Sequence, residues 1–279
     1  MLRKLFNFFV FSSLFISCCA VMMVHQTIHL MKLNIERQLL LFFVFFSTLC
    51  SYNFHWYFTP FSENERTRSA WTLQHRKLQL ALAILGGLVS VYFAFQMTQY
   101  WIWLFPGVIL TFLYTAPKLP VTILGNLKKI AIGKTIYLSF VWMYVTTGLP
   151  IFISGEVPAI KALLFCSGRF FLIYAICIIF DYRDREQDRK EGIRSMITYF
   201  SEKGIDRLFL FSLFIFLLST SMLYYFDLPV LAVIFLLIPG AITAALYKYS
   251  KTNYSDYLYY FVLDGLMMFS ALFTVFLPI

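Results

Sequence analysis

The chain has 279 residues, of which 60% are hydrophobic and 13% are charged, and its mean hydropathy is +0.75. A soluble globular domain carries about a quarter charged residues, so this composition excludes that class and is typical of an integral membrane protein. A formal net charge of +9 could attract nucleic acid. Basic residues beside membrane spans, however, set topology and attract anionic lipid headgroups, so we expect membrane lipid and no nucleic acid as a partner.

Nine apolar runs, each near the length of a membrane span, are separated by charged residues, proline or glycine. A helix needs roughly 20 apolar residues to cross the hydrocarbon core of a bilayer. Most connections between the runs are too short to fold on their own. We therefore predict an all-α bundle of nine transmembrane helices that forms a single domain over residues 1–279. The predicted spans are approximately 5–25, 38–58, 79–96, 100–115, 131–153, 159–180, 206–226, 229–247 and 257–277.

Lysine and arginine concentrate after every even-numbered predicted span, as in Arg76-Lys77, Lys128-Lys129 and Lys248. Cytoplasmic loops of membrane proteins carry an excess of these residues. We therefore expect a multi-pass protein of a bacterial-type plasma membrane, with a cytoplasmic N-terminus and an external C-terminus. Arg3-Lys4 before an apolar stretch is also typical of a cleaved signal peptide, and cleavage would leave the other eight spans oriented as before.

Acidic residues concentrate where the sixth predicted span meets the cytoplasmic surface. This segment, Asp181 to Arg194, reads Asp-Tyr-Arg-Asp-Arg-Glu-Gln-Asp-Arg-Lys-Glu-Gly-Ile-Arg. Charged groups near membrane depth are costly and tend to mark function. If the helix continues through this segment, steps of three and four residues place Asp181, Asp184 and Asp188 on one face.

Three carboxylates on one face repel one another, and a divalent cation removes that repulsion. Mg²⁺ prefers oxygen ligands, keeps several waters and often bridges to phosphate oxygens. The arginines within the same segment can meet a polyanion. The segment therefore suits a diphosphate that is held through Mg²⁺ while its hydrocarbon tail lies in the membrane. The alternative is a solvated charged loop that only sets the topology.

Other polar residues lie in or beside the predicted spans. Tyr114 and Lys118 end the fourth span on the same side and could contact phosphate oxygens, although both residue types are also typical of any such helix end. Asp264 lies about a third of the way into the last span, as a hydrogen-bonding partner or as part of a polar cavity. Arg169, in the middle of the sixth span, either snorkels outward or pairs inside the bundle.

On these residues the chain resembles the UbiA superfamily of intramembrane prenyltransferases. The second aspartate-rich motif of that family is similar to the segment from Asp181 to Arg194. Its Tyr-x-x-x-Lys element is similar to Tyr114 and Lys118, and a recurrent pair in its last helix is similar to Asp264-Gly265. The resemblance covers most of the chain and implies nine transmembrane helices with a cytoplasmic N-terminus.

The resemblance also implies an activity, which is transfer of an isoprenoid chain from a prenyl diphosphate to a lipophilic, aromatic acceptor. Mg²⁺ would be the cofactor, and stabilisation of the departing diphosphate would carry the catalysis. By this resemblance Asp181, Asp184 and Asp188 are the catalytic residues. Asp184 and Asp188 would bind the metal with support from Asp181, and Tyr114 and Lys118 would contact the diphosphate.

The first aspartate-rich motif of the family, Asn-Asp-x-x-Asp-x-x-x-Asp at the end of the second helix, has no intact counterpart. The expected equivalent begins at Asn53, but aromatic residues occupy the spacing of the three aspartates. These residues are Phe54, Tyr57 and Phe61. None of them binds Mg²⁺ as a carboxylate does, so half of the family's metal site is missing.

Two substitutes for the missing carboxylates stay open. Glu63 and Glu65 could supply replacement ligands, or Arg66 and Arg68 could offset the diphosphate charge without a metal. With Asn53, these arginines complete the predicted diphosphate-binding residues.

The leading hypothesis is thus a prenyltransferase with a reduced metal site. Its rival is a non-catalytic member that keeps the fold to bind an isoprenoid lipid or a partner membrane protein. A transporter is disfavoured, because the central thirds of the predicted spans are nearly all apolar.

Overall fold

The computed structural model describes residues 1–59, 67–115, 133–190 and 196–278, and within these ranges it contains helices and no β-strand. The α-helices are α1 (Leu2–Phe11), α2 (Leu14–Leu30), α3 (Arg37–Tyr57), α4 (Thr67–Gln74), α5 (Arg76–Gln96), α6 (Trp101–Thr115), α8 (Lys134–Met143), α9 (Leu149–Ser154), α10 (Ala159–Lys190), α11 (Met196–Tyr199), α12 (Glu202–Met222), α13 (Val230–Ser250), α14 (Asp264–Phe269) and α15 (Ala271–Thr274). A π-helical turn, Tyr144–Gly148, joins α8 to α9, and a second one, Leu258–Leu263, leads into α14.

Six helical stretches are long and apolar enough to cross a membrane, judged by length and composition. They are Arg37–Tyr57, Arg76–Gln96, Lys134–Ser154, Ala159–Glu186, Glu202–Phe226 and Val230–Ser250. The bent pair of α1 and α2 would make a seventh. The two remaining predicted spans are also helical but shorter, since α6 has 15 residues and Leu258–Thr274 falls below the length of a full span. The described residues therefore form a helical bundle in which six or seven stretches have the length and composition of a membrane span, and the predicted nine spans are not confirmed.

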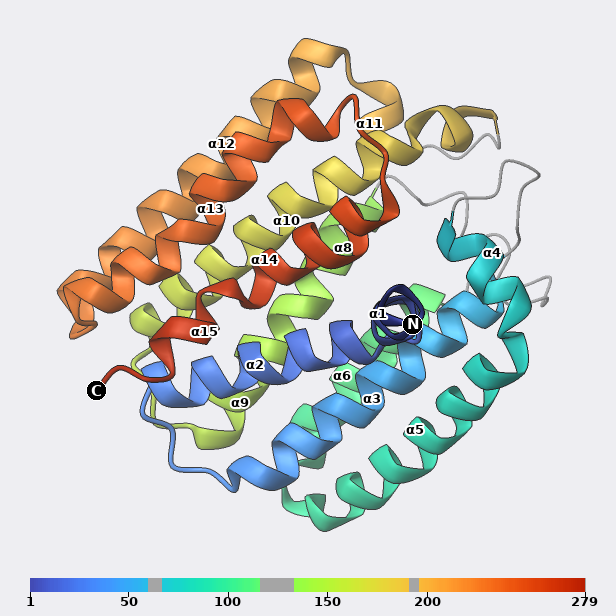
Figure 1. Ribbon diagram of the computed structural model, residues 1–279. Helices are drawn as coiled ribbons and strands as arrows, with labels where there is room; N and C mark the ends of the chain where they lie inside the picture. The colour runs from blue at the N-terminus through green and yellow to red at the C-terminus, as the bar shows by residue number, and fades with distance from the viewer. Residues whose placement is uncertain (60–66, 116–132, 191–195, 279) are drawn as a thin grey trace.

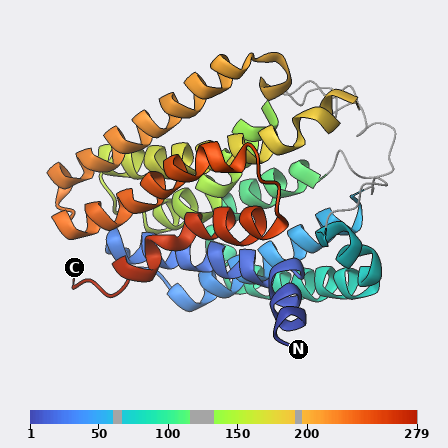
Figure 2. The same ribbon diagram turned by 45° about the horizontal axis from the view of Figure 1, so that its top comes forward.

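The first predicted span, 5–25, is not one straight helix. The chain bends by 59° between α1 and α2, at Ser13, whose φ of 67° lies in the left-handed region. α1 projects from the bundle with the N-terminus at its tip (Figure 2). It contacts the last helical segment, where the Tyr257 hydroxyl donates a 2.7 Å hydrogen bond to Asn7. No proline or glycine marks this break in the sequence, and for that reason the apolar run predicts a continuous span.

The long helices lie side by side along one direction (Figure 1). α3 packs between α2 and α5, α10 packs between α8 and α12, and α14 packs against α2 and α13. The contact between α3 and α5 is close because Gly86 has no side chain. A Cβ atom at Gly86 would lie 2.8 Å from the carbonyl oxygen of Phe46, so only glycine fits at this crossing.

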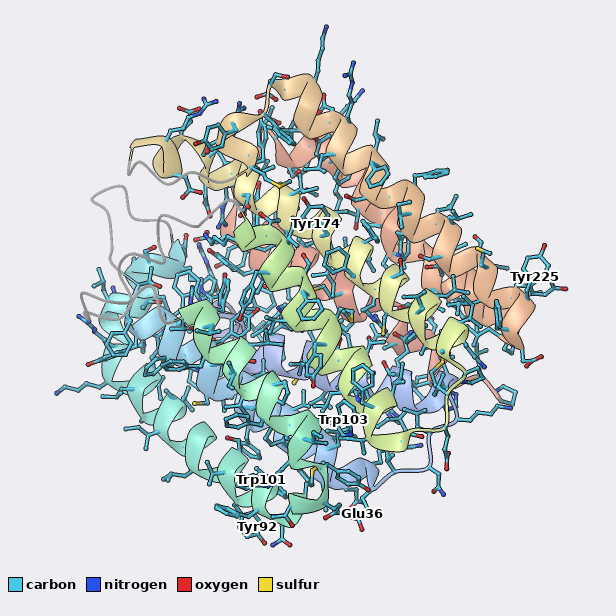
Figure 3. All side chains as sticks on the ribbon, turned by 180° about the vertical axis from the view of Figure 1, so that it is seen from behind. Glu36, Tyr92, Trp101, Trp103, Tyr174 and Tyr225 are labelled. Atoms are coloured by element: carbon cyan, nitrogen blue, oxygen red, sulfur yellow. The ribbon has the colours of Figure 1, made fainter. Side chains whose placement is uncertain are left out.

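The two ends of the bundle differ in their side chains. One end carries α4 and α11, together with the starts of α5, α8 and α12 (Figure 1). We call it the basic end, because Arg76, Lys134 and Arg185 lie there. Tyr92, Trp101 and Tyr225 lie at the opposite end (Figure 3), where the C-terminus is also found (Figure 1). The candidate site is built at the basic end, where six of the long helices start or stop.

Candidate active site

The C-terminal part of α3 presents one face to α6 and α8 at the basic end. The Tyr52 hydroxyl accepts a 2.9 Å hydrogen bond from the indole of Trp142 in α8. The ring of His55 stacks on the ring of Tyr114 in α6, with centroids 5.0 Å apart and an interplanar angle of 16°. The ring of Trp56, one residue further along, packs edge-to-face on Tyr260 of the last helical segment, with centroids 5.7 Å apart. This face therefore brings the predicted diphosphate contact Tyr114 beside α3.

The aromatic residues at the spacing of the missing aspartates point elsewhere. Each residue of an α-helix turns the chain by about 100°, which places Phe54 and Tyr57 opposite Tyr52 and His55. The ring of Tyr57 lies 4.8 Å from the guanidinium of Arg76, at the start of α5. Tyr57 thus faces α5 and not the site, and the helical period places Phe54 on the same side of α3, which favours a register other than the one that begins at Asn53.

A second set of residues has the same spacing and faces the site. Tyr52, His55 and Thr59 follow one another in steps of three and four residues, as the three aspartates of the first motif do. The hydroxyl of Thr59 donates a 2.7 Å hydrogen bond to the His55 carbonyl oxygen, which extends this face beyond the end of α3. The helical periodicity of α3 could have identified this set from the sequence. That would have required aligning the first aspartate-rich motif with the polar face of α3 and not with Asn53.

The three predicted catalytic carboxylates lie on α10, which runs without a break to Lys190 and so keeps them on one face. Asp181 is buried and accepts a hydrogen bond from the Thr135 hydroxyl of α8. Asp184 accepts hydrogen bonds of 2.9 and 3.2 Å from the guanidinium of Arg183. Asp188, one helical turn further along, is also buried. The helix thus continues through the acidic segment, which was the condition for placing the three aspartates on one face.

Lys134 is the cation that faces these carboxylates. Its ammonium group interacts electrostatically with Tyr114, Asp181, Asp188 and Asp184. These partners come from α6 and α10, so one side chain at the start of α8 couples the two helices. Lys134 thereby lowers the mutual repulsion of the three aspartates. From the sequence alone, we expected only a divalent cation in this role.

Sequence reasoning missed Lys134, because a lysine at the end of a membrane span is usually a topological signal. The sequence feature that could have identified Lys134 is the neighbouring Thr135. A lysine followed by a threonine at the start of a span can supply two hydrogen-bond donors to the acidic face of another helix.

Two buried arginines share an aromatic cluster formed largely by the last helical segment. The guanidinium of Arg68, from α4, lies 4.1 Å from the ring centre of Trp56 and 4.3 Å from that of Tyr260. Arg183 donates a 3.1 Å hydrogen bond to the Tyr260 hydroxyl and lies 4.3 Å from the ring centre of Tyr259. Stacking of this kind stabilises a buried cation that water does not reach. The predicted site residue Arg68 is thus joined by Arg183.

Carboxylates compensate these arginines from the same segment of chain. The backbone N–H of Arg68 donates a 2.8 Å hydrogen bond to Asp256. Asp264, one turn beyond Tyr260, interacts electrostatically with Arg68 and Arg183. Burial lowers the pKa of the Arg68 guanidinium, and the nearby Tyr260, Asp264 and Asp256 oppose that effect. The predicted cavity residue Asp264 therefore belongs to the same cluster.

Three buried nitrogen atoms of the two guanidinium groups have no hydrogen-bond partner among the described residues. They are Nε and Nη2 of Arg68 and Nη1 of Arg183. Buried donors of charged groups are costly when unpaired. Both groups are therefore suited to donate hydrogen bonds to the oxygens of an anion.

Asn53 has a different place from the one expected. Its side-chain amide is buried and donates hydrogen bonds of 2.9 Å to the carbonyl oxygens of Ser12 and Leu49. Asn53 thereby ties α3 to the bend between α1 and α2.

Several residues of the sequence hypothesis lie outside the described parts of the chain. They are Phe61, Glu63, Glu65, Arg66, Lys118 and Arg194. Neither the predicted diphosphate contacts Arg66 and Lys118 nor the substitute carboxylates Glu63 and Glu65 are therefore placed.

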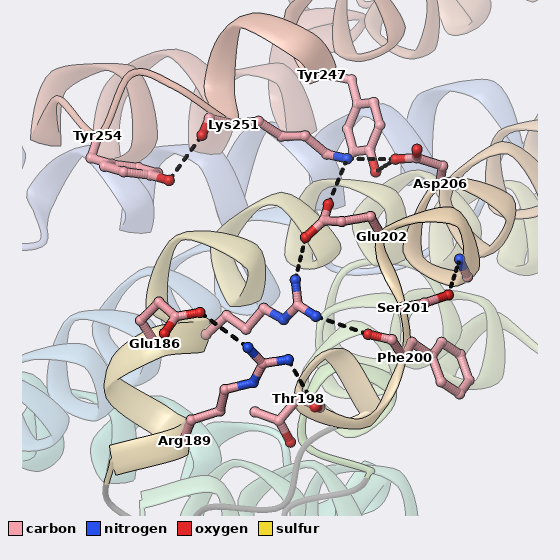
Figure 4. A network of polar contacts seen from close by, with 12 residues as sticks. Glu186, Arg189, Thr198, Phe200, Ser201, Glu202, Asp206, Tyr247, Lys251 and Tyr254 are labelled. Carbon is pink, nitrogen blue, oxygen red and sulfur yellow. Dashed lines mark hydrogen bonds and ion pairs between the residues drawn. The ribbon is translucent and has the colours of Figure 1, made fainter.

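A network of ion pairs fixes the end of α10 against α12 and α13 (Figure 4). Arg185 pairs with Glu202 and donates a 2.9 Å hydrogen bond to the Phe200 carbonyl oxygen. Lys251 pairs with Asp206 at 2.5 Å and with Glu202 at 3.5 Å. Asp184 and Asp188 flank Arg185 in sequence, so this network holds the helix turn that carries them.

The charge balance of the site bears on a metal. Lys134 interacts electrostatically with the three aspartates of α10, and Arg68 and Arg183 interact with Asp264. Among the described residues, however, no group of three or more His, Cys, Asp or Glu side chains could hold a metal ion. The donor set fits a Mg²⁺ ion that takes one or two carboxylates and completes its shell with phosphate oxygens and water. It does not fit an ion enclosed by protein ligands.

Comparison with known proteins supports the family that the motifs resemble. The model of the UbiA prenyltransferase family matches residues 63–272, which is well over half of the chain. A search of the curated proteins and a search of the solved structures each gave no match. The family match includes α10 with its three aspartates, α8 with Lys134, and the last helix with Asp264. The chain belongs to the UbiA prenyltransferase family.

Proposed function

We propose that the protein transfers the isoprenoid chain of a prenyl diphosphate to a lipophilic, aromatic acceptor at the basic end of the bundle. The observation that carries the proposal is the meeting of Lys134 with Tyr114 and the three aspartates of α10. This arrangement places acidic, basic and phenolic groups from three helices in one site. It would serve a ligand whose head is a diphosphate and whose tail is a hydrocarbon.

The reaction would break the bond between the first prenyl carbon and the diphosphate oxygen, and the electron pair would leave with the diphosphate. The allylic cation would then be attacked by a carbon of the acceptor ring, which finally loses a proton. The chain's own contribution is to bind the departing anion, and Lys134, Tyr114 and the unpaired guanidinium nitrogens of Arg68 and Arg183 are the groups for this task.

Members of the family generally use Mg²⁺. Asp184 and Asp188 would hold the ion with support from Asp181, and a bound Mg²⁺ supplies positive charge to the departing diphosphate. In this proposal Lys118 and Arg66 are further diphosphate contacts.

The proposed membrane arrangement follows the positive-inside rule. The basic end would face the cytoplasm of a bacterial-type plasma membrane, and the C-terminus would lie outside. The shorter helices α6 and Leu258–Thr274, together with the bent pair α1 and α2, would bring the number of spans to nine. A thin or locally deformed bilayer accommodates short spans at a modest cost.

The test is diphosphate release by the purified protein in detergent, measured with prenyl diphosphates of several lengths, with and without Mg²⁺. Asp184→Asn removes the charge of a proposed ligand, and Asp227→Asn is the matched control on an exposed turn at the opposite end. We expect metal-dependent release by the wild type and by the control, and loss of release in Asp184→Asn. Equal release by both variants would contradict the proposal.

A second candidate function is favoured by the face of α3, where Tyr52 and His55 replace carboxylates. The protein would then bind an isoprenoid lipid or a partner membrane protein without turnover. Binding of a prenyl diphosphate with no release of diphosphate for any donor length would support this alternative.

A further inference from the structure

A second polar site lies inside the bundle, far from the basic end. Arg169 is buried in α10, ten residues after the helix begins at Ala159. With a rise of about 1.5 Å per residue, this places Arg169 about 15 Å along the helix, near the middle of a bilayer core of about 30 Å. The same rise separates it from Asp181 by about 18 Å, so the two sites do not overlap.

Arg169 carries a charge that the described residues do not neutralise. Its guanidinium donates hydrogen bonds of 2.6 Å to Gln26 and 3.3 Å to the carbonyl oxygen of Met267, and both acceptors are neutral. No Asp or Glu side chain of the described residues forms an ion pair with it or interacts with it electrostatically. An unpaired charge at membrane depth is costly and calls for a counter-ion.

A small cavity of about 20 Å³ lies beside Arg169. Its lining includes Arg169, Thr220 and Ser270 among apolar side chains such as Phe165 and Phe216. A cavity needs roughly 10–15 Å³ to hold one water molecule, so this one is large enough for a small occupant. Its size suits a small monatomic counter-ion.

The hydroxyl of Thr220 is free to serve such an occupant. Buried threonines elsewhere in the bundle donate to the carbonyl oxygen four residues earlier, as Thr146 and Thr243 do at 2.7 Å. Thr220 makes no such bond, and its side chain lines the cavity. Gly168 brings α10 and α12 together here, since a Cβ atom at that position would lie 2.7 Å from the Thr220 hydroxyl oxygen.

We propose that this cavity binds a halide ion, chloride under ordinary conditions, between the guanidinium of Arg169 and the hydroxyl of Thr220. The ion neutralises Arg169, and Ser270 at the cavity wall is held by Gln26, whose side-chain amide donates a 3.0 Å hydrogen bond to its hydroxyl. The edges of Phe165 and Phe216 carry partial positive charge and tolerate an anion beside them. The site joins α10 and α12 to α2, because Arg169 also bonds Gln26, so its occupancy stabilises the bundle.

The test is thermal unfolding of the purified full chain in detergent at constant ionic strength, with gluconate replaced stepwise by chloride or bromide. We expect a saturable rise in Tm for the wild type. Thr220→Val keeps the side-chain volume and removes the hydroxyl, and should raise the half-saturating halide concentration about tenfold, the effect of one charge-assisted hydrogen bond. Arg169→Gln should abolish the rise, whereas the exposed Arg207→Gln on α12 should leave it unchanged.

A Tm that is independent of the anion in the wild type, or a halide response that Thr220→Val leaves unchanged, would overturn the proposal. Thr220→Val is the deciding variant if Arg169→Gln fails to fold. Crystals grown in bromide give a direct check. An anomalous peak beside Arg169 and Thr220 supports the halide site, and ordinary water density without anomalous signal contradicts it.

Discussion

Arg183 donates two hydrogen bonds to Asp184, the next residue of α10, through Nε at 2.9 Å and Nη2 at 3.2 Å. One nitrogen of the same guanidinium also donates to the Tyr260 hydroxyl. Asp184, a proposed metal ligand, is therefore oriented by its neighbour Arg183, which the last helical segment holds in place. A planar, bidentate donor is needed for this geometry, and lysine does not supply one.

Arg183→Lys is therefore expected to reduce kcat/KM for diphosphate release about tenfold, the loss of one charge-assisted hydrogen bond. The charge is kept, so the loss reports geometry. Steady-state release across donor concentrations measures it, with the exposed Arg207→Lys as the control. A variant with unaltered kcat/KM would show that the orientation of Asp184 does not matter.

Lys134→Met removes the cation that interacts with all three aspartates of α10. We expect the KM for a prenyl diphosphate to rise about tenfold or more, because the carboxylates then repel the diphosphate more strongly. Competition by inorganic pyrophosphate gives a second readout that does not require turnover. Lys161→Met, near the start of α10 at the opposite end, is the matched control, and an equal effect of both variants would argue against a role for Lys134.

The register of α3 yields a prediction about the missing motif. A carboxylate introduced by His55→Asp would face Tyr114 and the aspartates, whereas one introduced by Tyr57→Asp would face Arg76. We expect only His55→Asp to lower the Mg²⁺ concentration for half-maximal release, by about tenfold. The reverse result, with Tyr57→Asp alone raising metal affinity, would restore the register that begins at Asn53.

Asn53→Ala should affect stability more than ligand binding. The variant loses the hydrogen bonds to Ser12 and Leu49, and two buried carbonyl oxygens lose a donor. We expect a loss of about 1–3 kcal/mol in unfolding free energy with little change in KM for the donor. Thermal or denaturant unfolding measures this, and Asn34→Ala in the exposed connection before α3 is the control. A raised KM with unchanged stability would instead support a diphosphate contact.

The positions of the helices could be read from the sequence because apolar run length is a strong signal in a membrane protein. The bend at Ser13 could not, since neither proline nor glycine marks it and a left-handed φ is uncommon for serine. The unbroken extension of α10 through Asp188 was conditional in the sequence, and its stability depends on Arg185 and Glu202, which lie on different helices.

The site was predictable where its residues are close in sequence and uncertain where they are not. Asp181, Asp184 and Asp188 follow helical spacing, so one helix suffices to group them. The couplings of Lys134 to Asp181 and of Asp264 to Arg68 join residues far apart along the chain, and spacing carries no information about such pairs. The acidic face could therefore be predicted from the sequence, whereas its cationic partners could be identified only from the structure.

The central claim is that Asp184 takes part in breaking a prenyl diphosphate and passing its chain to a lipophilic acceptor. The most direct measurement incubates membranes that contain the protein with a labelled prenyl diphosphate and Mg²⁺, and separates labelled lipids by mass spectrometry. We predict a labelled lipophilic product with the wild type and with Asp227→Asn, and none with Asp184→Asn. Recovery of only unreacted donor bound to the wild-type protein would contradict the claim and leave a lipid-binding role.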